Sequence, residues 1–153
     1  MPSGVHLEGR DILRPRVRLV LLRVGGVLLL GLGLLHLAAT PFIVRMLQEG
    51  AAPDAAAWLT PPMVLNHVVV GILLLPCGGL IYYAAPGAAA GARWALVVSR
   101  SIALAIAALV PTLFLVMGLQ YFGALPFRIA TTMVCAATGT LLVTAFWPSG
   151  RHA

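Results

Sequence analysis

The sequence predicts an all-α integral membrane protein, a bundle of four antiparallel transmembrane helices. Of its 153 residues, 61% are hydrophobic and only 9% are charged, which leaves too few polar side chains to cover a water-soluble fold. The apolar residues fall into four long runs without a single acidic residue, at about 24–44, 63–83, 101–119 and 129–147. We therefore expect one transmembrane domain over residues 1–153.

The first run, residues 24–44, is the clearest membrane span. At about 1.5 Å per residue it is roughly 31 Å long, which matches a hydrocarbon core of about 30 Å. Its polar residues are His36 and Thr40, and helical spacing puts both on the face that carries Gly33. Because small residues on a lipid-embedded helix mark the side where another helix approaches, we expect His36 to face the bundle.

The other three runs repeat this combination of small and polar residues. The second, 63–83, follows Pro61 and Pro62, which suit the first turn of a helix because its N–H groups are unbonded there. Each of these three runs carries one such set of residues, and the set on 129–147 is a polar face that we expect to point inward. The sets are His67, Gly71, Leu74 and Gly78 on 63–83; Ser101, Ala105, Ala108 and Thr112 on 101–119; and Thr131, Thr132, Cys135, Thr138 and Gly139 on 129–147.

The remaining segments are expected to be short and irregular. Residues 1–18, interrupted by Pro15, predict a basic, mostly disordered cytoplasmic tail. The segments 46–61 and 84–93 are expected to be loops, since they contain glycine and proline.

The distribution of arginine predicts the orientation of the bundle. Eight arginines flank the runs on the side of the two termini and only two, Arg45 and Arg128, flank them on the other side. By the positive-inside rule both termini are cytoplasmic, and we expect a multi-pass protein of a bacterial-type inner (cytoplasmic) membrane.

His36 and His67 are the candidate cofactor ligands. They fall at comparable depth on neighbouring helices, and the glycines beside them would let a flat macrocycle approach, which is what a bis-histidine haem b requires. A copper or zinc site would need a further ligand, for which Cys135 is the candidate. The simpler interpretation is that each histidine makes an interhelical hydrogen bond or lines a wet cavity.

Arg23 and Arg100 are the candidate lipid-binding residues. Both lie at the inner boundary of a span and no acidic residue within a span can pair with them, so we expect them to bind anionic headgroups, together with Tyr82 or Tyr83. The net charge of +6 is explained by such membrane contacts, and nucleic-acid binding is not expected because no recognition element accompanies it.

The sequence contains no complete catalytic set. Ser99 and Ser101 are expected on the opposite side of the membrane from the histidines, the two cysteines are not in a C-x-x-C motif, and no carboxylate lies within a span. The favoured function is a non-catalytic accessory or structural subunit that associates with copies of itself or with other membrane subunits. The alternatives are an electron-transfer subunit with haem b on His36 and His67, and a transporter of small solutes or lipids.

Overall fold

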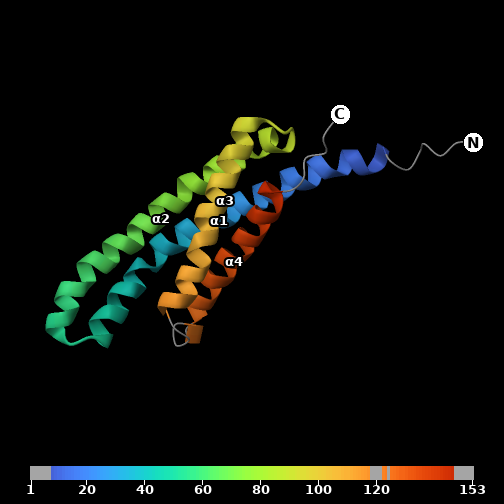
Figure 1. Cartoon of the computed structure of the whole chain (residues 1–153). Helices are drawn as coiled ribbons and strands as arrows, with labels where there is room; N and C mark the ends of the chain where they lie inside the picture. The colour runs from blue at the N-terminus through green and yellow to red at the C-terminus, as the bar shows by residue number, and fades with distance from the viewer. Residues whose placement is uncertain (1–7, 118–121, 124, 147–153) are drawn as a thin grey trace, which may run out of the picture.

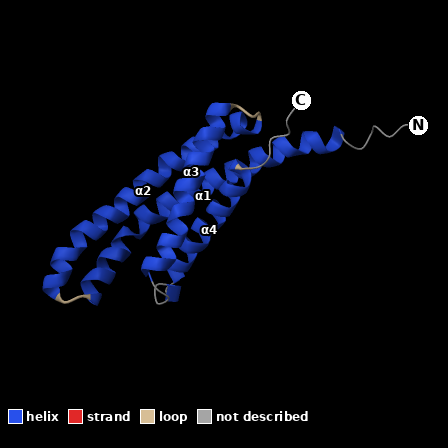
Figure 2. Cartoon of the chain, viewed as in Figure 1, coloured by secondary structure: helices blue, strands red, loops and turns tan. Residues whose placement is uncertain are grey.

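The structure, a computed structural model, describes residues 8–117, 122, 123 and 125–146, with side chains from residue 15 onward. Within these ranges the regular structure is helical (Figures 1 and 2). All four helices are long and apolar enough to span a membrane, which confirms the predicted all-α fold of four long apolar helices. The helices are α1 (Glu8–Gly50), α2 (Pro53–Ala89), α3 (Arg93–Met117) and α4 (Leu125–Ala145).

The helices form a ring in which each packs against two neighbours. Helix α1 packs on α2 and α4, and α3 closes the ring by packing on the same two helices (Figure 1). The helices are unequal: α1 and α2, with 43 and 37 residues, are about 64 and 55 Å long, whereas α3 and α4, with 25 and 21 residues, are about 37 and 31 Å long. The pair α1 and α2 therefore extends past α3 and α4.

The predicted loop at 46–61 is wrong, because most of it is helical. Helix α1 continues to Gly50, α2 begins at Pro53, and residues 51 and 52 make the whole connection. Alanine is the commonest residue in this segment, and alanine, leucine, glutamine and glutamate are all strong helix formers. The expectation of a proline in the first helical turn holds for Pro53 rather than for Pro61 and Pro62, which lie inside the helix.

The predicted linker at 84–93 is also shorter than expected. Helix α2 continues through its alanines to Ala89, and α3 begins at Arg93. The connection is a Schellman motif, in which Gly91 adopts φ of +81° and the N–H of Ala92 donates to the carbonyl of Gly87 at 2.8 Å. A glycine is required at position 91 because other residues rarely adopt this left-handed conformation.

The prediction of a disordered tail over 1–18 is wrong where the structure describes it. Helix α1 already begins at Glu8 and continues through Pro15. A proline inside a helix removes one backbone hydrogen bond, and here the good helix formers on both sides keep the helix continuous. Residues 1–7 lie outside the described residues, as do 118, 119 and 147 at the ends of the third and fourth predicted spans.

Glycines bring the backbones of α1 and α2 into direct contact. A Cβ atom at Gly78 would lie 2.7 Å from the carbonyl oxygen of Gly26, and one at Gly33 would lie 2.9 Å from the carbonyl oxygen of Gly71. We call these four residues the glycine seam. Their spacing of seven residues on each helix is that of a left-handed helix pair. The contacts between the helices follow in antiparallel order: Arg23 with Tyr82, Gly26 with Gly78, Gly33 with Gly71, and His36 with His67.

Helix α4 packs on the other side of α1 through a different stripe from the one predicted. Gly25 of α1 receives the side chain of Leu141, and Gly31 lies against Met133. Of the expected polar face, Thr138 is buried but Cys135 and Gly139 are exposed, so that part of the prediction is wrong. The hydroxyl of Thr132, an exposed member of that face, donates to the carbonyl of Arg128 one turn back on the same helix, so it does not need a partner inside the bundle. The buried residues of α4 are Val134, Ala137, Thr138, Leu141, Thr144 and Ala145.

Replacing Gly78 by alanine tests the glycine seam against a neighbour on the same helix. The added methyl group in Gly78→Ala meets the backbone of α1, whereas Gly79→Ala adds it where nothing lies within 4 Å. Both changes gain the same helix propensity, so the difference between them isolates the packing. We expect Gly78→Ala to be less stable than Gly79→Ala by about 1–3 kcal/mol in reversible detergent unfolding. Equal stability of the two variants would contradict the seam.

Candidate functional site

The structure brings the two predicted histidines together between α1 and α2. The imidazole centroids of His36 and His67 are 4.7 Å apart with an angle of 29° between the ring planes, so the rings are stacked. His36 Nδ1 lies 3.1 Å from the carbonyl oxygen of Leu32, one turn back on its own helix. His67 Nε2 is buried and has no hydrogen-bond partner among the described residues. Both side chains are half-buried, which agrees with the expectation that they face the bundle rather than the lipid.

This arrangement does not fit a haem b held between the two residues. Axial imidazoles approach an iron end-on from opposite faces of the macrocycle, with their nitrogens pointing toward each other. His36 and His67 instead lie face against face at 4.7 Å, which leaves no space for a porphyrin between them. The neighbouring glycines offer no space either, because atoms of the opposite helix occupy the space beside Gly33 and Gly71.

Cys135 does not complete a metal site with the histidines. It is exposed on α4, whereas Met133, two residues earlier, faces α1 at Gly31. Two residues correspond to about 200° of rotation around a helix, so the cysteine points away from α1. In the described part of the chain, no three His, Cys, Asp or Glu side chains lie close enough together to hold a metal ion.

The two predicted lipid-binding arginines lie at one end of the bundle. We call it the basic end, where α1 and α3 begin and α2 and α4 finish. The guanidinium of Arg23 lies over the ring of Tyr82, 5.3 Å from its centroid, a contact with one of the two tyrosines that the sequence suggested. Arg100 Nε donates to the carbonyl oxygen of Ala145 at 3.1 Å, which satisfies a free carbonyl at the end of α4. Both arginines remain exposed, and their binding of headgroups stays a prediction.

The structure adds a third arginine, Arg18, which belongs to the segment 1–18 that was predicted to be a disordered tail. Arg18 is buried, with only 5% of its surface exposed. Its Nε and Nη2 atoms are buried and make no hydrogen bond to any described residue, and it lies close enough to Arg100 for the two charges to interact. Ser99, next to Arg100 in the sequence, is fully buried, and its hydroxyl also has no partner in the described structure.

The spacing of Arg18 along α1 agrees with its burial, although its charge does not. The buried residues of α1 recur at intervals of three and four residues, and Arg18 lies four residues before Leu22 on the same stripe. Because charged residues are usually exposed, the sequence predicts a solvated position for Arg18 in the tail rather than a buried position on this stripe. The stripe consists of Arg18, Leu22, Gly25, Leu29 and Leu32.

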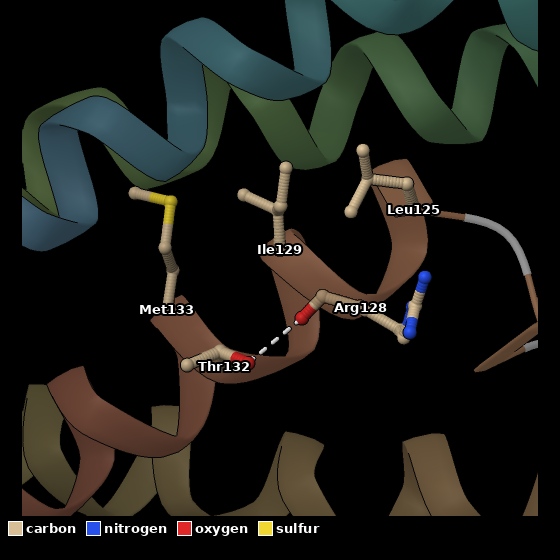
Figure 3. Close-up of a pocket in the computed structure, with 5 residues that line it drawn as sticks. All are labelled: Leu125, Arg128, Ile129, Thr132 and Met133. Atoms are coloured by element: carbon tan, nitrogen blue, oxygen red, sulfur yellow. Dashed lines mark hydrogen bonds between the residues drawn. The ribbon is translucent and has the colours of Figure 1, made fainter.

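The end opposite the basic end, called the far end, carries two shallow hollows. One of about 350 Å³ is lined by α4 residues (Figure 3), where Ile129 and Met133 extend toward the neighbouring helices and the Thr132 hydroxyl donates to the carbonyl oxygen of Arg128 at 2.9 Å. The second, of about 510 Å³, lies between Gln48 and the start of α2. Both linings stay at the far end, so neither hollow provides the passage that a transporter would need.

Comparison of the chain with protein-family models, with curated proteins and with solved structures gives no match.

A double-mutant cycle tests the histidine pair. We expect the effects of His36→Ala and His67→Ala on unfolding free energy to be coupled by about 0.5–1.5 kcal/mol, because each substitution removes the same ring contact. The matched control combines His36→Ala with Asn66→Ala, since Asn66 is adjacent in sequence to His67 but exposed. That pair should be additive within about 0.5 kcal/mol. Additivity in both cycles would show that the rings do not interact.

Proposed function

We propose that this protein is a small structural or accessory subunit of a membrane assembly, without a catalytic centre of its own, which binds another transmembrane chain through the outward face of α3. The partner is a second copy of this chain or another membrane subunit.

The outward face of α3 is the observation that carries this proposal. The small-residue stripe of this helix points away from the bundle, and all of its members are exposed. Its spacing of four, three and four residues is that of a seam between two helices. Helices in lipid associate by close van der Waals packing, which small residues permit. The stripe consists of Ser101, Ala105, Ala108 and Thr112, and the hydroxyl of Thr112 is already bonded to the carbonyl of Ala108 at 2.9 Å.

The separation of the reactive side chains supports a non-catalytic role. Ser99 lies near the basic end, on the part of α3 where Ala95 packs against Gly87 of α2. Because α2 and α3 are antiparallel, Ser99, four residues after Ala95, lies level with the α2 residue four before Gly87. His67 lies 20 residues before Gly87, so 16 residues of α2 separate the two levels. The serine and the histidine are therefore separated by about 24 Å along the bundle, too far for nucleophile activation.

The separation of arginines by end supports the proposed orientation, with both termini on the cytoplasmic side of a bacterial-type inner membrane. Arg18, Arg23 and Arg100 belong to the basic end, whereas Arg45 and Arg128 belong to the far end. Positively charged residues are retained on the cytoplasmic side during insertion.

Purification in mild detergent from the membranes that contain the protein tests the proposed function. We expect the 16.0 kDa chain to migrate as part of a larger complex, either with copies of itself or with another membrane protein. A strictly monomeric species that turns over a substrate without a partner would contradict the proposal.

Bulky substitutions on α3 test the surface. Ala105→Leu combined with Ala108→Leu should weaken association in vesicles at least about tenfold, because the added side chains keep the partner helix away. The control, Gly79→Leu, adds the same side chain to a position on α2 where a Cβ meets nothing within 4 Å. Association measured by energy transfer between labelled chains should be unchanged in the control. An equal loss in both variants would mean that the face of α3 is not specific.

A further inference from the structure

The basic end contains a buried charge for which the described structure offers no counter-ion. Arg18 is 5% exposed, and two of its three guanidinium nitrogens are buried without a hydrogen-bond partner in the part of the chain that the structure describes. An arginine remains protonated in proteins, so its charge cannot be removed by loss of a proton. A buried charge is costly unless an anion or other acceptors compensate it.

The chain has four acidic residues, and the two whose side chains the structure describes, Glu49 and Asp54, are poorly placed to supply that anion. Glu49 and Asp54 are at the far end, next to the connection between α1 and α2. Glu8 and Asp11 precede Arg18 on α1 by 10 and 7 residues, which puts their backbones about 15 and 10 Å farther out along the helix.

Arg100 increases the need for an anion. It belongs to α3, its Nε is bonded to the end of α4, and its charge acts on Arg18. The carbonyl of Ala145 and the ring of Phe146 partly compensate the charge of Arg100, but the buried nitrogens of Arg18 bond to no carbonyl of the described residues. Two neighbouring guanidinium groups of like charge repel unless an anion lies between them, and phosphate oxygens match the planar fork of donors on arginine.

The depth of Arg18 corresponds to that of lipid phosphates. Arg23 is the charged residue at the start of the uncharged run 24–44 of α1, and Arg18 lies five residues before it, about 7.5 Å farther along the helix. The headgroup layer of a bilayer extends about 5–7.5 Å beyond each side of the hydrocarbon core. Arg18 is therefore level with the headgroups although it is covered by protein.

We propose that Arg18 and Arg100 together bind one phosphate group at the basic end, where α1 passes the end of α4. The group belongs to an anionic phospholipid headgroup or is a free phosphate ion, and the depth of Arg18 favours the lipid. Arg100 is exposed and meets the phosphate first, while Arg18 provides donors from inside the bundle. The site is separate from the outward face of α3.

Arg18→Met and Arg16→Gln distinguish this site from general attraction to an anionic surface. Both substitutions remove one positive charge from the same part of α1, but Arg16 is exposed. The proteins are reconstituted in phosphatidylcholine discs alone, in discs with one fifth phosphatidylglycerol, and in phosphatidylcholine discs with inorganic phosphate. Thermal unfolding and native mass spectrometry of retained phospholipid are measured for each variant.

Phosphatidylglycerol should raise the unfolding temperature of the natural protein and of Arg16→Gln by several degrees and should leave Arg18→Met unchanged. The affinity of Arg18→Met for the retained lipid should be at least about tenfold weaker. In phosphatidylcholine alone Arg18→Met should be folded and at least as stable as the natural protein, since it removes an unpaired buried charge. A matching shift with inorganic phosphate would identify the free ion as a ligand of the same site. Equal lipid retention and equal shifts in all three proteins would overturn the proposal.

Discussion

The direct backbone contact between α1 and α2 is the constraint on which the rest of the bundle depends. At the glycine seam the two helices approach so closely that even a methyl group would meet a carbonyl oxygen. Such proximity fixes both the distance between the helices and their register, because the glycines must lie opposite one another. In a lipid environment, where apolar side chains gain little by leaving the solvent, close packing of this kind is a principal source of association.

The register of the seam determines what the polar residues can do. It places His36 against His67 just beyond Gly33 and Gly71, so that each imidazole occupies the space a cofactor would need. At the other end it places Tyr82 beside Arg23. Helices α3 and α4 then pack on the outside of this pair, and the end of α4 brings Arg100 near Arg18. The histidine rings therefore pack against each other, whereas two guanidinium nitrogens of Arg18 have no hydrogen-bond partner in the described structure.

The sequence predicted the existence of the four helices but not their ends. The length of an apolar run is set by the thickness of a membrane, whereas a helix continues for as long as residues such as Ala89 and Gln48 favour it. Helices α1 and α2 therefore extend well past the apolar runs 24–44 and 63–83. The meeting of His36 and His67 followed from their shared stripes with glycine. The sequence did not predict what occupies the space beside each glycine, because that depends on the backbone of the opposite helix.

Two features of the candidate sites lay beyond simple pattern analysis for a related reason. Arg18 continues the buried stripe of α1, but charged residues at the edge of a span are usually exposed, so only packing reveals that it is covered. The small residues of α3 and α4 look alike in the sequence, since either side of a lipid-embedded helix can be apolar. The packed neighbours decide which stripe is buried, and on α3 the stripe with Ser101 and Thr112 remains free.

Disulfide formation between α1 and α2 in membranes tests the register of the glycine seam most directly. In a chain with both natural cysteines replaced by alanine, Leu37→Cys with Gly71→Cys should form an intramolecular disulfide on mild oxidation, because a Cβ at Gly71 lies 3.0 Å from Leu37 Cγ. Leu37→Cys with Leu75→Cys, one helical turn out of register, should remain reduced. The account is contradicted if the second pair forms the disulfide as readily as the first, or if the first pair stays reduced.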